Sequence, residues 1–388
     1  MKRIALLGST GSIGEQTLAV AAQFPERYQV TALAAGKRVD KLAEQVRRFR
    51  PQLVAVADDA GAQALRAQLG AETPALEVGA RGLIAVAEAP ADTVVSALVG
   101  AVGLAPTLAA IHEGREIALA NKEVMVMAGA LVRRELERHR VALLPVDSEH
   151  SGAFQALAGQ RREDVAKLTL TASGGPFRTW SAERMERATV AEALKHPNWA
   201  MGPKITIDSA TLANKALEVI EARWLFDLPA EKLGVVVHPQ SIVHALVEYA
   251  DGSVLAQLGM PDMRVPISLA LAWPERLPLA LPRLDLAQIR QLDFEPPDPK
   301  RFPCLELAWA ALAGGEAAPA VFNAANEVAV AAFLAGEIAF PVIARTNARV
   351  LERHLAAGGA ALGSLDDVLA VDAEARRRAR EQVEEMRG

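Results

Sequence analysis

The chain has 388 residues, with 42 lysines and arginines against 47 aspartates and glutamates, so its formal net charge at pH 7 is −5. Hydrophobic residues make up 51% and charged residues 23%, a balance that excludes a disordered chain and indicates a folded globular protein. The mildly acidic charge provides no long-range attraction for nucleic acid or an anionic membrane. At roughly 100–200 residues per domain, this length predicts two or three domains.

The first residues, MKRIALLGSTGSIG, contain an apolar run that is too short for a signal peptide. The longest uncharged stretch, Thr93 to Ile111, contains Pro106, so a buried strand, loop and helix is favoured over a membrane span. The only cysteine, Cys304, excludes an intrachain disulfide framework and fits a reducing compartment. We therefore expect a cytoplasmic protein with no membrane or nucleic-acid partner.

Residues 1–146 alternate short apolar runs with amphipathic segments, which is typical of a Rossmann-like α/β domain built on a parallel sheet. The expected strands are residues 3–7, 30–35, 53–57, 94–98, 116–120 and 141–146.

The rest of the chain changes in character. Residues 147–273 predict an α+β domain with a hairpin turn at Asp251-Gly252. Its strand-like segments are residues 167–172, 204–207, 235–238, 242–249 and 253–259. The proline-rich residues 274–303 predict a connector, and the alanine-rich residues 304–388 predict a C-terminal helical domain.

Three glycines, Gly8, Gly11 and Gly14, separate the first predicted strand from an amphipathic helix. Glycines allow a tight turn and a close approach of the backbone to a pyrophosphate, and the helix N-terminus supplies amide groups to the anion. The GxxGxxG spacing differs from the common GxGxxG, and a purely structural glycine turn is the alternative. Its place at the start of a βαβ series favours a dinucleotide loop.

The second predicted strand ends in Gly36, Lys37 and Arg38, and the first acid, Asp40, follows two residues later. An NAD site usually has an acid at this point for the ribose 2′-hydroxyl, whereas basic groups suit the 2′-phosphate of NADP. The pattern favours NADP(H), with a solvated loop as the alternative.

Carboxylates follow the last strand of the first predicted domain, where Asp147 and Glu149 lie in the motif DSE. Ligands of open α/β sheets bind beyond the carboxyl ends of the strands, so both acids are expected near the cofactor. A hard divalent cation needs further oxygen ligands, and Glu218 is the candidate for the third carboxylate. A polar exit from the strand is the alternative.

Glu218 belongs to a segment that is expected to form a helix with Asp208 or Ser209 as its N-cap. A serine at a helix N-terminus with a lysine one turn on predicts a phosphate site. An exposed ion pair between Lys215 and Glu218 is the alternative. One face of the expected helix carries Thr211, Lys215 and Glu218, with Asn214 beside it.

Together these motifs resemble one family, 1-deoxy-D-xylulose-5-phosphate reductoisomerase of the non-mevalonate isoprenoid pathway. The resemblance implies an NADPH-dependent homodimer that rearranges and reduces 1-deoxy-D-xylulose 5-phosphate, a small phosphorylated sugar, to 2-C-methyl-D-erythritol 4-phosphate. It implies Mg²⁺ or Mn²⁺ as the metal, with Co²⁺ as a further candidate. The matching segments, in the family's order from residue 4 to about 330, are LLGSTGSIGEQTL, AAGKR, ALANKE, PVDSEHSG, TASGGPFR, HPNWAMGPKITIDSATLANKALEVIEA, HPQSIVHALVEY, GMPDMRVPI and NAANEVAV.

The resemblance also implies roles for individual residues. The metal ligands are Asp147, Glu149 and Glu218, and the catalytic residues are Lys122, Glu149 and His196. The cofactor-binding residues are Thr10, Gly11, Ser12, Ile13, Gly36, Lys37, Asn121, Glu123 and Gly202. Arg38 joins them on the basic pattern after the second strand, because asparagine is common there in the family. The substrate-binding residues are Lys122, Ser148, Glu149, Ser173, His196, Trp199, Ser209, Asn214, Lys215 and Glu218. Residues 196–202 correspond to a mobile flap in which Trp199 covers the substrate, and Ala200 stands where serine is common.

Two other functions compete with this one. An NADP-linked dehydrogenase of phosphorylated semialdehydes would need a catalytic cysteine, and Cys304 lies far along the chain from every nucleotide motif. A non-catalytic NADPH-sensing protein would have no use for three carboxylates and a phosphate site.

Overall fold

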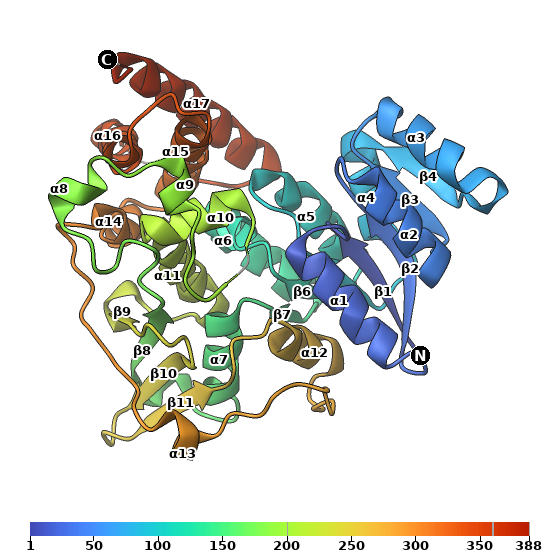
Figure 1. The fold of residues 1–388 in the computed structure, drawn as a ribbon, viewed down its shortest axis with the longest axis horizontal. Coiled ribbons are helices and arrows are strands. Elements are labelled where there is room, and N and C mark those ends of the chain that lie inside the picture. Colours follow the sequence, from blue (N-terminus) through green and yellow to red (C-terminus); the bar gives the residue numbers. More distant parts are fainter. Residues whose placement is uncertain (200, 359–360, 388) are drawn as a thin grey trace. The chain divides into compact units, whose positions relative to one another are not determined.

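The computed structural model describes residues 1–199, 201–358 and 361–387, and Figure 1 shows its elements. The flap residue Ala200 lies outside these ranges. The chain forms two compact units, each of which is described by itself. The first unit comprises Met1–Val124, Val132–Ser148 and Asp262–Ala280, and the second comprises Met125–Leu131, Glu149–Pro261 and Leu281–Gly388. The division at residues 146, 273 and 303 expected from the sequence stays a prediction.

A parallel sheet forms the centre of the first unit, with the order β4-β3-β2-β1-β5-β6-β7 among the described residues. The central strands are almost wholly buried, as expected where helices cover both faces. The strand order reverses at β1, which pairs with β2 and β5, so a ligand crevice is expected at the carboxyl end of β1. The strands are β1 (Lys2–Leu7), β2 (Tyr28–Ala34), β3 (Leu53–Val56), β4 (Ala75–Val78), β5 (Thr93–Ser96), β6 (Glu116–Leu119) and β7 (Leu143–Pro145).

Helices connect these strands along the chain. A further helix, from much later in the chain, packs against the first of them. The connecting helices are α1 (Ser12–Gln23), α2 (Val39–Phe49), α3 (Asp59–Leu69), α4 (Gly79–Glu88), α5 (Leu104–His112) and α6 (Glu123–His139), with short 3-10 turns at Gly70–Glu72 and Ala101–Gly103. Helix α12 (Arg264–Ala272) packs against α1, and Lys2 donates a hydrogen bond to the carbonyl of its Leu271 at 3.0 Å. Non-helical dihedral angles at Ala128 divide α6 into two parts.

The second unit contains a mixed sheet with the order β11-β10-β8-β9 among the described residues. Its strands are β8 (Val165–Ala172), β9 (Leu233–Val237), β10 (Val243–Tyr249) and β11 (Val254–Leu258). Strands β8 and β9 are parallel, and the other pairs are antiparallel. The hairpin between β10 and β11 turns at Asp251-Gly252, where Gly252 has a φ of +82°, so this predicted turn is confirmed.

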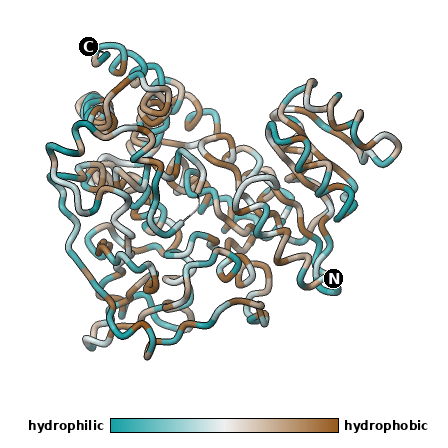
Figure 2. Tube along the Cα trace, in the orientation of Figure 1, coloured by the Kyte–Doolittle hydropathy of each residue, from teal (hydrophilic) through white to brown (hydrophobic). Residues whose placement is uncertain are grey.

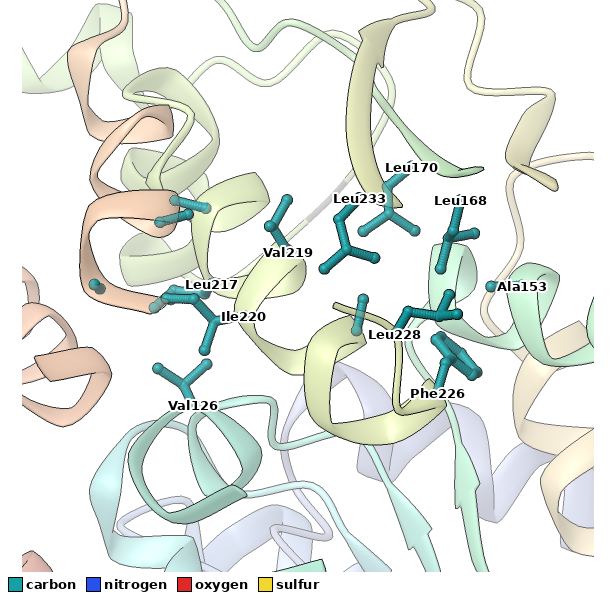
Figure 3. Close-up of a cluster of buried hydrophobic side chains, with 14 of the residues drawn as sticks. Val126, Ala153, Leu168, Leu170, Leu217, Val219, Ile220, Phe226, Leu228 and Leu233 are labelled. Carbon is teal, nitrogen blue, oxygen red and sulfur yellow. The ribbon is translucent and has the colours of Figure 1, made fainter. Parts of the chain in front are cut away.

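The core of the second unit lies between α11 (Ala213–Phe226) and this sheet. Leu217, Val219 and Ile220 of α11 belong to the same buried cluster as Leu168, Leu170 and Leu233 of the sheet (Figure 3). Burial of each such side chain contributes about 1.5–3 kcal/mol to folding. The other helices are α7 (Ser148–Leu157), α8 (Ala182–Met185), α9 (Val190–Ala193), α10 (Pro203–Ala210), α13 (Leu286–Ile289), α14 (Leu307–Ala313), α15 (Ala318–Leu334), α16 (Phe340–Ala356) and α17 (Leu365–Glu385), with 3-10 turns at Arg162–Asp164, Ala230–Lys232 and Pro303–Leu305.

The last helix, α17, has two faces. Figure 2 shows hydrophilic and hydrophobic residues alternating along it, and its buried residues include Val368, Ala375 and Val383. Within the described ranges, no helix has both the length and the apolar character that crossing a membrane requires.

The predicted fold class is confirmed, because a Rossmann-like parallel sheet, a second sheet and C-terminal helices are all present. Two details differ. Strand β4 was not expected, and the strand expected at residues 204–207 is wrong, because these residues belong to α10. Gly202 is the N-cap of α10 and Pro203 takes its first position, a combination that starts a helix and outweighs the β-branched residues that follow.

Candidate active site

The loop after β1 folds back so tightly that two of its glycines cannot carry a side chain. Gly8 has a φ of +88°, and a Cβ there would lie 2.5 Å from the carbonyl oxygen of Ala97. A Cβ on Gly14 would lie 2.3 Å from the carbonyl oxygen of Gly8. Helix α1 begins directly after Gly11, and glycine has no side chain that could cap the first amides of the helix. The first-turn amides of α1 are therefore suited to bind an anion.

Basic side chains lie next to this loop at the carboxyl end of β2. Lys37 and Arg38 are both exposed, and Arg38 Nη1 lies 3.5 Å from Glu15 Oε1 in the first turn of α1. The first acid, Asp40, accepts a hydrogen bond from Gln68 Nε2 at 2.6 Å. The residues directly after β2 are thus basic, while the acid that follows them is bonded to a neighbouring helix.

Polar residues after β6 and β7 share this carboxyl edge of the parallel sheet. Asn121 Nδ2 donates to Glu123 Oε2 at 2.6 Å and to the carbonyl of Gly100 at 3.2 Å. Lys122 Nζ donates to Asp147 Oδ2 at 2.5 Å, and the two side chains are only 7% and 14% exposed. The first unit therefore holds a nearly buried lysine–aspartate pair where ligands of such sheets bind.

The second unit places two predicted carboxylates on one ammonium group. Lys215 Nζ of α11 lies 3.4 Å from Glu149 Oε1 in the first turn of α7, and it forms an ion pair with Glu218. Asn214 Nδ2 donates to the other oxygen of Glu218 at 2.5 Å. The Lys215 and Glu218 side chains are 4% and 1% exposed. The alternative of an exposed ion pair is therefore wrong, because the pair is buried.

This donor set fits a hard divalent cation. Glu149 and Glu218 already converge on one positive charge, and carboxylate oxygens are the ligands that Mg²⁺ and Mn²⁺ prefer. Asp147 precedes Glu149 by two residues, so the extended chain limits the separation of their Cα atoms to about 7 Å.

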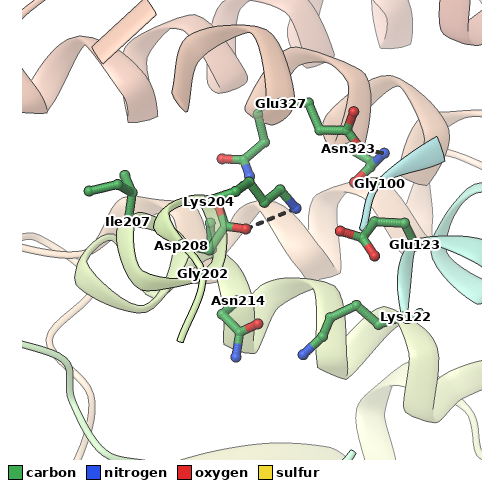
Figure 4. Close-up of polar contacts among 12 residues, drawn as sticks. Gly100, Lys122, Glu123, Gly202, Lys204, Ile207, Asp208, Asn214, Asn323 and Glu327 are labelled. Carbon is green, nitrogen blue, oxygen red and sulfur yellow. Dashed lines mark hydrogen bonds and ion pairs between the residues drawn. The ribbon is translucent and has the colours of Figure 1, made fainter. Parts of the chain in front are cut away.

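The helix start that was expected at Asp208 or Ser209 is wrong. Both residues lie in α10, and a separate helix, α11, begins after Leu212, which has a left-handed φ of 57°. Asp208 does not cap α11, because its carboxylate bonds to Lys204 Nζ at 2.9 Å (Figure 4). It also accepts a hydrogen bond from Asn326 Nδ2 at 2.6 Å. Ser209 is therefore near the end of a helix.

A neighbouring loop nevertheless reaches Ser209. Gly175 follows β8 with a φ of +67°, and a Cβ there would lie 2.5 Å from the carbonyl oxygen of Ser209. The amide of Gly175 also donates to Ser173 Oγ at 3.2 Å. Gly175 of the TASGG segment thus lets the Ser173 loop lie against the end of α10.

His196 connects this loop to the predicted flap. Its Nδ1 accepts the backbone N–H groups of Asn198 and Trp199 at 3.1 and 3.0 Å, so its proton resides on Nε2. Nε2 then donates to Ser173 Oγ at 3.0 Å. Burial lowers the pKa of His196 to about 4, which keeps the imidazole neutral at pH 7. Trp199 is half-buried.

The cysteine that the competing dehydrogenase function requires is inaccessible. Cys304 is fully buried beside Asn347, and burial raises the pKa of its thiol to about 12. A nucleophilic cysteine needs a lowered pKa and some exposure. This geometry excludes Cys304 as a catalytic nucleophile.

Sequence reasoning missed one contributor to these clusters, Lys41, and the long-range partners of another, His150. Lys41 Nζ lies 2.6 Å from Glu15 Oε1, which makes it another basic group beside the glycine loop, and its spacing of three from Arg38 was the available signal. His150 is fully buried, with Nε2 2.9 Å from the carbonyl oxygen of Glu218 and Nδ1 3.3 Å from Glu221 Oε2. It links α7 to α11, and no local pattern in the sequence indicates that link.

The glycine loop, the basic groups after β2 and the buried carboxylate–lysine clusters together define a class, that of dinucleotide-dependent oxidoreductases with a carboxylate metal site. Comparisons with known proteins place the chain within this class. A family described as 1-deoxy-D-xylulose 5-phosphate reductoisomerase matches residues 4–129, and C-terminal domains of the same family match residues 143–226 and 258–378. The chain belongs to this family.

Individual relatives extend over nearly the whole chain. A 1-deoxy-D-xylulose 5-phosphate reductoisomerase of Chlorobium phaeobacteroides (strain BS1) is 56% identical over 97% of this chain and 98% of its own. That of Geotalea uraniireducens (strain Rf4) is 53% identical over 98% of each chain. The Zymomonas mobilis enzyme in complex with NADPH is similar with a TM-score of 0.91 and 45% identity over 99% of each chain. A reductoisomerase in complex with NADPH, fosmidomycin and magnesium has a TM-score of 0.93 and 43% identity over 99% of this chain and 98% of its own.

Proposed function

We propose that this chain catalyses the NADPH-dependent rearrangement and reduction of 1-deoxy-D-xylulose 5-phosphate to 2-C-methyl-D-erythritol 4-phosphate in isoprenoid biosynthesis, with a divalent metal ion. The observation that carries the proposal is the convergence of Glu149 and Glu218 on the buried ammonium of Lys215. The two carboxylates are suited to bind a metal ion, and the ammonium beside them is suited to bind a phosphate. Relatives solved with NADPH and magnesium support both cofactors.

The cofactor is assigned to the carboxyl edge of the parallel sheet. The amides after Gly11 receive its pyrophosphate, and Lys37 and Arg38 receive the 2′-phosphate. Bound NADPH supplies the hydride. The other contacts assigned to it are Thr10, Ser12, Ile13, Gly36, Asn121, Glu123 and Gly202.

The metal is assigned to Asp147, Glu149 and Glu218, and when bound it supplies Lewis-acid polarisation of the substrate carbonyl. Lys122, which donates to Asp147, holds that carboxylate in place and offers a positive charge beside the nicotinamide and substrate. His150 fixes the backbone of Glu218 through its 2.9 Å contact to the carbonyl oxygen.

The substrate is assigned to residues of the second unit and to Ser148, the first residue of α7. Lys215 and Asn214 supply donors from the first turn of α11, and a phosphate can attract the same ammonium that now pairs with two carboxylates. Ser173 and Ser209 supply hydroxyl groups near the phosphate end. Neutral His196 orients Ser173 and holds the backbone of Trp199, so the flap can cover the substrate and exclude water.

One assay tests the activity directly. The purified chain with Mg²⁺ or Mn²⁺ should oxidise NADPH only after 1-deoxy-D-xylulose 5-phosphate is added, and 2-C-methyl-D-erythritol 4-phosphate should appear in equal amount. An NADPH-sensing protein would bind the cofactor without consuming it, and that result would contradict the proposal.

Cofactor preference gives a first prediction. Replacing both Lys37 and Arg38 by alanine should raise the KM for NADPH by about tenfold or more, the scale of one to two charge-assisted hydrogen bonds, and should leave the KM for NADH nearly unchanged. The measurement is steady-state kinetics with each cofactor. Arg66→Ala, at an exposed position on α3, is the matched control. Equal changes for both cofactors would refute the 2′-phosphate assignment.

Flap closure gives a second prediction. Proteolytic cleavage near Trp199 should slow when NADPH, Mg²⁺ and a phosphonate analogue bind together, because closure removes this backbone from solvent. Limited proteolysis followed by mass spectrometry measures the cleavage rate. Cleavage in residues 283–290, an exposed part of the second unit, is the internal control. An unchanged rate at Trp199 would identify a rigid segment in place of a flap.

The homodimer and the cytoplasmic location are proposals of the same kind. In the described structure β11 pairs with β10 alone, and its Val254 and Leu255 side chains are 51% and 42% exposed. An apolar edge strand of this kind favours coverage by a second copy.

The buried thiol of Cys304 supports a reducing compartment.

A further inference from the structure

A cluster of two histidines and one glutamate lies on the first unit, and none of its members is among the residues assigned above. His112 is the last residue of α5, and Glu135 and His139 are one turn apart at the end of α6. His112 Nε2 lies 3.1 Å from Glu135 Oε2, and His139 Nε2 lies 3.5 Å from the same oxygen. Two imidazole nitrogens from two helices therefore converge on one carboxylate oxygen.

We propose that His112, Glu135 and His139 form a second metal site that binds Zn²⁺. In a tetrahedral zinc site with bonds of about 2.0–2.2 Å, neighbouring ligand atoms lie roughly 3.3 Å apart. The two observed separations, 3.1 and 3.5 Å, are close to this value. All three ligand atoms also lie within 4.8 Å of one another. Small shifts of these side chains are enough to seat the ion.

The chemistry of the donors selects the metal. Two imidazoles with one carboxylate are a common zinc ligand set, and water completes the fourth position. Mg²⁺ prefers oxygen ligands, so the ion of the carboxylate site has little affinity for this one. The His112 side chain is 52% exposed, which leaves a path for the ion and its water.

The electrostatic surroundings also favour a cation. Both histidines end their helices, where the helix dipole contributes partial negative charge. Arg138 Nη1 lies 4.0 Å from Glu135 Oε1, whereas both imidazole contacts are made to Oε2, and the Arg138 side chain is 76% exposed. Bound Zn²⁺ would link the end of α5 to the end of α6, the helices that precede and follow β6 in the chain.

The test uses the full-length protein, stripped of metal by a chelator and then saturated with Mg²⁺ so that the carboxylate site is filled. Calorimetric titration with Zn²⁺ should show one further equivalent per chain. His112→Gln and His139→Gln should each weaken this binding by at least about tenfold, the lower range for disturbed metal sites. His354→Gln, which removes a histidine of α16, and Glu218→Gln should leave it unchanged.

Two independent readouts support the titration. Co²⁺ at this site should give the strong visible absorption of low-coordinate cobalt with imidazole ligands, and His139→Gln should abolish it. Zn²⁺ should also raise the melting temperature of the parent chain and of His354→Gln, but not that of His112→Gln. Absence of the extra equivalent, or equal binding in both histidine variants, would show an ordinary hydrogen-bonded surface cluster and overturn the proposal. Loss in only one of the two variants would also overturn it, because both helices must contribute.

Discussion

Replacing Glu218 by glutamine should lower Mn²⁺ affinity by at least about 100-fold and abolish turnover, while NADPH binding is preserved. The change keeps the size of the side chain and removes its charge. Glu218 is 1% exposed and lies with Glu149 around one ammonium, so the change removes one buried carboxylate from the three proposed ligands. Changes in the partners of metal ligands alone typically cost 10–100-fold in affinity, and loss of a ligand exceeds that.

The experiment is a calorimetric Mn²⁺ titration beside NADPH fluorescence on the same variant. Glu221→Gln is the matched control, because Glu221 lies on the same helix, is equally buried and contacts His150. If Glu218→Gln binds Mn²⁺ as tightly as the parent chain, the three-carboxylate site is wrong. If both variants lose the metal equally, α11 itself has been disturbed and the loss cannot be attributed to ligation.

The parallel sheet was predictable because its signal is local. Buried strands between helical segments read as short continuous apolar runs, and six of the strands of the first unit appear this way. Strand β4 was missed because it lies at the edge of the sheet, where the residues alternate between exposed and half-buried and include Glu77. An edge strand needs less hydrophobicity than a central one, so its pattern is weak.

The helix around Ser209 shows where local patterns mislead. The spacing of Ser209, Lys215 and Glu218 suggested one continuous helix, but Leu212 adopts a left-handed conformation between two helices. A leucine in that conformation is unusual and costs about 1–2 kcal/mol. Its side chain is buried in the second unit, so tertiary packing offsets the cost, and no spacing rule contains that information.

The candidate site residues could be proposed from motifs, but their pairings could not. The sequence placed Lys122 and Asp147 after neighbouring strands, and only the fold shows that one donates to the other. Likewise, Lys215 was expected to face a phosphate, and its contact with Glu149 depends on how α7 packs against α11. Long-range ion pairs of this kind depend on packing between elements distant in the chain.

The pairing of Lys215 changes what its removal should do. Lys215→Ala should weaken binding of phosphorylated substrate by about 1.5–3 kcal/mol, roughly 10- to 150-fold, because a charge-assisted hydrogen bond to phosphate is lost. Mn²⁺ affinity should rise at the same time, because the ammonium that competes for Glu149 and Glu218 is gone. Lys215→Arg keeps the positive charge and should lie between the parent and the alanine variant in both measurements.

The two effects can be separated with ligands that differ only in the phosphate. Calorimetry should show weaker binding of 1-deoxy-D-xylulose 5-phosphate to Lys215→Ala, but the same affinity for unphosphorylated 1-deoxy-D-xylulose as in the parent chain. A fall in affinity for both sugars would indicate a damaged site. A fall in Mn²⁺ affinity would mean that Lys215 holds the two carboxylates in place for the metal, since an ammonium that only competes with the ion cannot strengthen its binding.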